Sequence, residues 1–202
     1  MRRKDDRALT ASELYREFGA APPERKMGFL RTVRQVLFFP DHFFQQVERI
    51  PVPQAFGHLL KIALFPGLWM LVAQFAFGGG FAASAKAGAS TYLGVIISAI
   101  FSAGIVHLAV KLAGGKKNVG ETFKVASFAG TPWFVLSPSL IPSIFGLIWA
   151  VYLQTIGLAA SQRIGKLPAF FATILPILVW IGIVAYVVIT YPEKVLEILG
   201  GA

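Results

Sequence analysis

The sequence contains no cysteine, which excludes disulfides, thiol catalysis and thiolate metal sites. Charged residues are also scarce: they make up 14% of the chain, whereas soluble domains average about 25%. The three histidines, His42, His58 and His107, are scattered along the chain, and none lies at metal-ligand spacing. We therefore expect neither a metal site nor a cofactor site.

Apolar residues, in contrast, are abundant. They make up 55% of the 202 residues, and the mean hydropathy is +0.65. A soluble protein of this composition would expose large apolar patches to water, so we expect lipid to cover most of the surface. The net charge of +9 comes mostly from the first sixty residues and from loops beside apolar runs. That distribution favours an anionic membrane surface, and not nucleic acid, as the partner of the positive charge.

Runs of about 20 mostly apolar residues predict membrane-spanning helices. The motif SPSLIP at 137–142 divides the longest run, because two nearby prolines do not continue a helix. The fold class that we predict is an all-α integral membrane bundle of five transmembrane helices within a membrane domain at 51–191, followed by a short outer tail at 192–202. The expected spans lie near 59–79, 91–112, 122–138, 142–161 and 168–190.

Lysine and arginine alternate between the connections of these spans. The connection at 79–91 has one lysine, the one at 111–124 has four, including Lys124, and the one at 161–168 has Arg163 and Lys166. Because basic loops stay in the cytoplasm, this alternation predicts a cytoplasmic N-terminus and a C-terminus outside. The expected location is a bacterial inner membrane.

The segment at 25–50 predicts an amphipathic interfacial helix ahead of the first span. Between 26 and 39 its apolar residues gather on one side at helical spacing, with Arg31 and Arg34 on the other, where they would face anionic headgroups. Pro40 ends this helix. Residues 1–24 are charged and of mixed sign, which predicts a mobile tail.

The motif GGKKNVGETF at 114–123 differs in one position from the nucleotide-binding loop G-x-x-x-x-G-K-[ST]. Glu121 replaces the lysine and would repel a phosphate, and the preceding element is a predicted transmembrane helix instead of a strand. We interpret the motif as a helix connection, in which Gly114 and Gly115 end one helix and Glu121 favours the start of the next. Lys116 and Lys117 hold the loop in the cytoplasm.

Several short patterns resemble the Yip-domain family of five-span membrane proteins. They are FFPDHFF, KLAGGKKNVGETFKVASFAGTPW, IP-x-x-x-G-L-IWAVYLQTIGLA and SQRIGKLPAF, in that order, and the resemblance covers about residues 34–190. Eukaryotic members associate with prenylated Rab-type GTPases and with each other. This chain is more similar to the compact bacterial members, because a basic amphipathic segment replaces the long acidic domain of the eukaryotic proteins. The resemblance therefore implies a membrane role, and it carries over no binding residue.

Polar residues inside the spans are few. No acidic residue falls inside a predicted span, so we expect neither an enzyme nor an ion-driven transporter. Gln74, His107 and Gln154 form a candidate intramembrane polar site. The alternative is a neutral His107 that hydrogen bonds to a backbone carbonyl or to a polar residue on another span. Prolines inside the spans can also kink helices and open a polar groove.

Small residues mark one side of the predicted fourth span and let helices approach closely, within the chain or between copies of it. The most favoured function is therefore a non-catalytic protein that organises the membrane or binds protein partners, or itself, through helix faces and its basic surface. The alternative is a lipid-translocating or transport-complex subunit with a polar groove. No small-molecule ligand can be named. The candidate partner or headgroup contacts are Arg31, Arg34, Lys116, Lys117, Arg163 and Lys166, and the packing stripe is Gly146, Ala150, Gly157 and Ser161.

Overall fold

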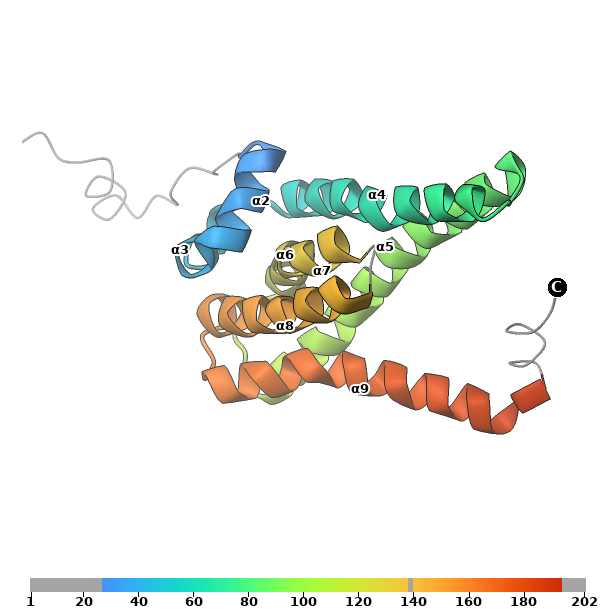
Figure 1. Ribbon diagram of the computed structural model, residues 1–202. Coiled ribbons are helices and arrows are strands. Elements are labelled where there is room, and N and C mark those ends of the chain that lie inside the picture. The colour runs from blue at the N-terminus through green and yellow to red at the C-terminus, as the bar shows by residue number, and fades with distance from the viewer. Residues whose placement is uncertain (1–26, 138–139, 194–202) are drawn as a thin grey trace, which may run out of the picture.

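The computed structural model describes residues 27–137 and 140–193, and within these ranges every regular element is a helix (Figure 1). The tail predicted at 1–24 lies outside the described residues, as does most of the tail predicted at 192–202. The elements are α2 (Phe29–Phe38), α3 (Pro40–Phe44), the 3-10 turn η1 (Val47–Arg49), α4 (Val52–Ala76), α5 (Phe81–Leu112), α6 (Val119–Ala129), α7 (Thr131–Leu136), α8 (Leu140–Gln162) and α9 (Lys166–Thr190).

Four of these helices, α4, α5, α8 and α9, are long and apolar enough to cross a membrane. They correspond to the predicted first, second, fourth and fifth spans. All four begin earlier than we predicted, α4 by seven residues and α5 by ten, and α4 ends three residues before the predicted end of the first span. The stretch at 79–91 is helical from Phe81 onward and is not a loop. Its alanines explain the difference, because alanine has the highest helix propensity. The turn that remains includes Gly78, whose φ of 88° lies in the left-handed region that glycine tolerates.

The segment predicted as the third span consists of two short helices, α6 and α7, with a break at Gly130. Pro132 has no N–H, so the carbonyl of Phe128 lacks its normal helical donor. The hydroxyl of Thr131 donates to that carbonyl instead, at 2.6 Å. The break is therefore repaired locally, and α7 continues along α8.

One end of the bundle carries α2, α3, η1, the loop between α5 and α6, and the loop between α8 and α9. We call it the basic end, and the opposite end, with the loop at 77–80 and Tyr191, the far end (Figure 1). The main core lies toward the basic end. Phe43 and Phe44 of α3 pack there against Phe128 of α6 and Leu153 of α8.

The helix α2 buries one side against the bundle, whereas we predicted that its apolar side faces lipid. Thr32 and Val36 are buried, while Leu30 and Phe38 are exposed on the same side as the exposed Arg31 and Arg34. The apolar residues therefore divide between the bundle and the outside, and do not form the single lipid-facing side that we predicted.

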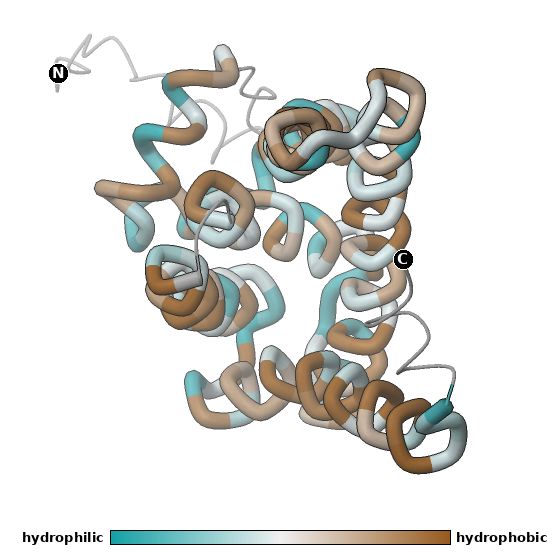
Figure 2. The backbone as a smooth tube through the Cα atoms, turned by 45° about the vertical axis from the view of Figure 1, so that its right-hand side comes forward, coloured by the Kyte–Doolittle hydropathy of each residue, from teal (hydrophilic) through white to brown (hydrophobic). Residues whose placement is uncertain are grey.

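Toward the far end the helices separate. Figure 1 shows α4, α5 and α9 extending past the connection between α7 and α8. Residues 181–190 of α9 are all exposed. Figure 2 shows α9, at the bottom of the view, as hydrophobic over nearly its whole length, whereas hydrophilic residues recur along α2 at the upper left. Apolar side chains without protein partners are what lipid contact requires.

The helices α4 and α5 remain paired where α9 is separate. Gly67 and Gly88 allow this close approach: a Cβ on Gly88 would lie 2.8 Å from the Cβ of Leu71 and 2.9 Å from the carbonyl of Gly67. The pair is thus held by backbone proximity, with no need for polar groups.

Candidate functional sites in the bundle

The loop at 113–118 contains two glycines of the motif that resembles a nucleotide-binding loop. Here these glycines end one helix, and Asn118 begins the next. Gly114 has a φ of 85° just after α5, and a side chain on Gly115 would collide with Val110. Asn118 caps α6, and its side-chain oxygen accepts a hydrogen bond from the Glu121 N–H at 3.2 Å. Helix termination by the two glycines is therefore confirmed, as is the position of Glu121 in the first turn of the next helix.

A buried glutamine, which we did not single out from the sequence, joins this loop to three helices. The side-chain oxygen of Gln162 accepts from the Lys117 N–H at 3.0 Å, and its amide nitrogen donates to the Thr122 hydroxyl oxygen at 3.0 Å. The Thr122 hydroxyl lies 2.9 Å from Nδ1 of His107. We call these residues the Gln162 cluster: His107, Lys117, Thr122 and Gln162.

Lys124 is the second buried polar group near the basic end. We placed it in a cytoplasmic loop, but it belongs to α6 and is only 2% exposed. Its ammonium pairs with Glu121 at 2.7 Å and donates to the backbone carbonyls of Glu48 and Ile50 at 3.1 and 2.9 Å. All three of its N–H donors thus have an acceptor. Lys117 pairs with the Glu48 side chain at 3.2 Å, so two lysines connect η1 to α6 and its preceding loop.

His58 forms the third buried contact, between α4 and α7. Its Nε2 lies 2.9 Å from the Thr131 hydroxyl, which already donates to Phe128. His58 therefore donates from Nε2, and its Nδ1 has no partner among the described residues. Its ring packs against Phe29 and Phe128, with centroids 5.4 and 4.9 Å away. This histidine links α2, α4, α6 and α7.

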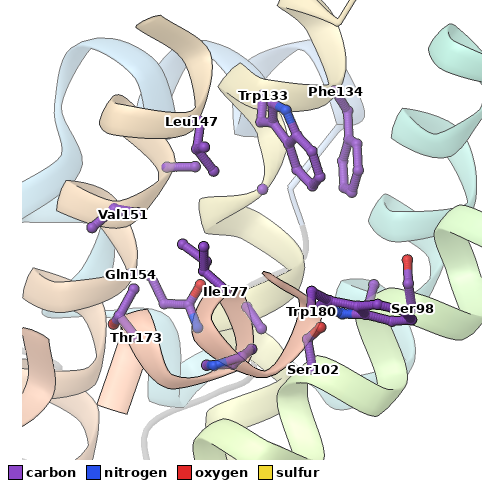
Figure 3. A pocket seen from close by; sticks show the side chains of 15 residues that line it. Ser98, Ser102, Trp133, Phe134, Leu147, Val151, Gln154, Thr173, Ile177 and Trp180 are labelled. Atoms are coloured by element: carbon purple, nitrogen blue, oxygen red, sulfur yellow. The ribbon is translucent and has the colours of Figure 1, made fainter. Parts of the chain in front are cut away.

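A cavity of about 390 Å³ lies between α5, α6, α7, α8 and α9 (Figure 3). Its lining is mostly apolar and aromatic, with Trp133 and Trp180 among the largest side chains. Gln154 extends from α8 into this group of side chains. A volume of this size is typical of small-molecule sites.

The predicted intramembrane polar site is not one site. His107 belongs to the Gln162 cluster, Gln154 lines the cavity, and Gln74 is exposed near the far end beside Gly79. We expected His107 to hydrogen bond to a backbone carbonyl or to a polar residue on another span. Its partner is a polar residue, Thr122 of α6. Among the residues that the structure describes, no three histidine, aspartate or glutamate side chains gather to hold a metal ion.

The predicted basic contacts are brought to one end. Backbone hydrogen bonds place Lys116 and Lys117 beside Gln162, which directly precedes Arg163, and Lys166 begins α9. Arg31, Arg34, Lys116, Arg163 and Lys166 are exposed.

The predicted packing stripe on α8 faces inward. A side chain on Gly146 would collide with the backbone of α7, and one on Gly157 would meet Val125 and Phe44. Ala150 lines the cavity, and Ser161 is 1% exposed. The small residues thus allow α8 to approach α3, α6 and α7 within one chain.

Comparison with known proteins identifies the family of this chain. The Yip1 domain family matches residues 34–189, more than half of the chain, and the chain belongs to this family. No curated protein and no solved structure matches it.

Proposed function

We propose that this member of the Yip1 domain family is a non-catalytic integral membrane protein that organises the cytoplasmic membrane surface. It would bind protein partners, or copies of itself, through its basic end. The observation that carries the proposal is the burial of Lys124, which fixes the segment α2–η1 to the bundle. Because that segment is fixed, the exposed arginines of α2 and the basic loops keep a constant arrangement and act as one surface.

The exposed side of α2 fits the boundary between headgroups and acyl chains. Leu30, Arg34 and Phe38 follow one another at intervals of four residues, so they share one helix face. An arginine between two apolar side chains can extend to a lipid phosphate while its neighbours enter the acyl region. The basic end would then lie in the cytoplasm, in agreement with its lysine and arginine content.

A fifth crossing by α6 and α7 follows if α5 and α8 both span the membrane. Both helices end at the basic end, because Lys116 and Lys117 hydrogen bond to Gln162. The chain must therefore cross between them, and α6 and α7 are the helices available. The 18 residues from Val119 to Leu136, which include Gly130 between the two helices, reach about 27 Å, close to the hydrocarbon thickness of about 30 Å. With the basic end in the cytoplasm, five crossings would put the N-terminus inside and the C-terminus outside.

Labelling of single cysteines tests this topology with little background, because the chain has none of its own. Lys116→Cys and Arg163→Cys should react with a membrane-impermeant maleimide only from the cytoplasmic side. Ser137→Cys and Lys86→Cys should react only from outside. Labelling of Ser137→Cys from the same side as Lys116→Cys would contradict a crossing by α6 and α7.

Crosslinking in native membranes tests the interaction surface. The variant keeps Lys117 and Lys124, which hold the fold, and changes five predicted contact residues to glutamine: Arg31, Arg34, Lys116, Arg163 and Lys166. We expect co-purified proteins, or a self-crosslink, to fall at least about tenfold, as the loss of several charge contacts would produce. Lys86→Gln at the far end is the matched control and should change nothing. An unchanged set of partners in the neutralised variant would overturn the proposal.

The cavity in Figure 3 favours a second candidate, a lipid-translocating or transport-complex subunit, because Gln154 gives a hydrophobic site a polar group. Purified protein in vesicles should then accelerate the movement of a fluorescent lipid with an uncharged polar headgroup between leaflets. Gln154→Leu should reduce that rate without changing assembly. A rate equal to that of protein-free vesicles would eliminate this candidate.

A further inference from the structure

The cavity contains hydrogen-bonding groups that have no partner among the described residues. The hydroxyls of Ser98 and Thr173 donate to carbonyls of their own helices, at 3.0 and 2.9 Å. The Ser102 hydroxyl and the Gln154 amide also line the cavity, and neither hydrogen bonds to a described residue. An unpaired amide in an apolar region is costly, so this site favours an occupant that accepts hydrogen bonds.

The charge of the lining restricts that occupant. None of the fifteen residues around the cavity is charged. A phosphate or carboxylate inside it would lose its hydration without gaining a cationic partner. The available donors are neutral: the Gln154 amide, the Ser102 hydroxyl and the two indole N–H groups. An uncharged acceptor, such as a carbonyl oxygen, matches them.

The walls of the cavity indicate where the occupant enters. Trp133 stacks on Phe134, with ring centroids 5.3 Å apart. Trp180 packs edge-on against Phe101, with ring centroids 6.2 Å apart. Both indoles remain accessible, with exposed fractions of 42% and 41%. They belong to helices whose outer surfaces are apolar, so an entrance beside the two indoles would face the bilayer and would admit a lipid-soluble molecule.

We propose that this cavity binds an uncharged lipid whose carbonyl oxygen accepts hydrogen bonds from Gln154 and Ser102. Two sources supply this chemistry, the ester carbonyls of a diacylglycerol and the ring carbonyls of an isoprenoid quinone. In either case the apolar chains extend past the tryptophans into the bilayer. The site does not depend on the proposed role of the basic end, because it shares none of the exposed basic residues.

Photolabelling tests the proposal on the full chain in phosphatidylcholine vesicles, with a photoreactive diacylglycerol and a photoreactive quinone as separate probes. Labelling by either probe should map to the cavity residues between 147 and 154 and between 173 and 180. The probe that labels identifies the source. Unlabelled diacylglycerol or quinone should compete, whereas phosphatidic acid, which is a diacylglycerol with an added phosphate, should compete at least tenfold less. Absence of labelling by both probes, or equal competition by phosphatidic acid, would overturn the proposal.

Two variants tie the labelling to the named groups. Gln154→Leu keeps the volume and removes the amide, and should reduce labelling about fivefold, the effect of one lost hydrogen bond. Its fold should be preserved, because the amide bonds to no described residue. Ser102→Ala is a smaller change and should reduce labelling about threefold. Gln74→Leu makes the same exchange on α4 outside the cavity and should leave labelling unchanged. Wild-type labelling of Gln154→Leu would exclude the proposed contact.

Discussion

The two ends of the bundle are held together by different forces. At the basic end, Lys124, Thr122 and His58 are buried and hydrogen bonded to other elements of the bundle. At the far end, α4 and α5 meet at two glycines, and the last ten residues of α9 are all exposed in the described structure. Buried polar bonds have strict geometry, whereas apolar helix surfaces slide and separate in lipid at low cost. The comparison indicates that the basic end fixes the fold and that the far end is free to change shape.

The largest effect should come from Lys124→Met. This change leaves the buried Glu121 carboxylate and two backbone carbonyls without their donor. We expect the free energy of unfolding in detergent micelles to fall by about 3 kcal/mol. Lys116→Met, an exposed lysine of the same region, should have an effect below about 0.5 kcal/mol. Equal stability of the two variants would contradict the role of Lys124.

The next effect should come from Thr122→Val, which keeps the shape and removes the hydroxyl between His107 and Gln162. The buried Gln162 amide and the half-buried His107 ring then lose a partner, so the free energy of unfolding should fall by about 2 kcal/mol. Thr155→Val is the matched control, because that hydroxyl donates only to Val151 of its own helix. If Thr155→Val lowers the free energy of unfolding as much as Thr122→Val does, the hydrogen bonds of the Gln162 cluster do not stabilise the fold.

At the far end, Gly88→Ala should weaken the pairing of α4 and α5. The added methyl group collides with Leu71 and with the carbonyl of Gly67, at a cost of about 1–2 kcal/mol. Gly94→Ala lies on the same helix in open space and should be neutral or slightly stabilising. Thermal unfolding of both variants checks the difference. A neutral Gly88→Ala would show that the helices are not in close contact there.

The smallest effect should come from Val184→Ala on α9, because this valine is exposed in the described structure. The free energy of unfolding of the Val184→Ala variant should differ from that of the wild type by less than about 0.5 kcal/mol. Leu153→Ala in the core, by comparison, should cost about 2–5 kcal/mol. A loss of 2 kcal/mol in Val184→Ala would instead reveal that a second copy or a partner covers α9.

Hydropathy predicted the parts of this fold that depend on lipid. The four long helices, the break at SPSLIP and the glycine-rich end of α5 follow from composition and from the chemistry of glycine and proline. The start of α5 could not be predicted from composition, because a run of alanine, serine and glycine is typical of both a helix and a loop.

The buried polar contacts could not be predicted in the same way. From the sequence, we placed Lys124 in a loop. In the structure it lies on α6 and donates to the carbonyls of Glu48 and Ile50, which are more than seventy residues away in the sequence. Gln162 and Thr122 are forty residues apart, and no short motif marks their contact. Gln154 stood out because a glutamine within an apolar helix is rare, but the cavity around it arises from several helices. Single polar residues can be found in a sequence, whereas their partners require the fold.

Spin-label distances measured in lipid nanodiscs test the difference between the two ends most directly. Cysteines at Arg31 and Lys166 report on the basic end, and cysteines at Phe77 and Ile189 report on the far end, all at exposed positions. The account predicts a narrow distance distribution for the first pair and a distribution at least twice as wide for the second, because only the first is held by buried hydrogen bonds. Distributions of equal width would contradict it, and would mean that the far end is as firmly packed as the basic end.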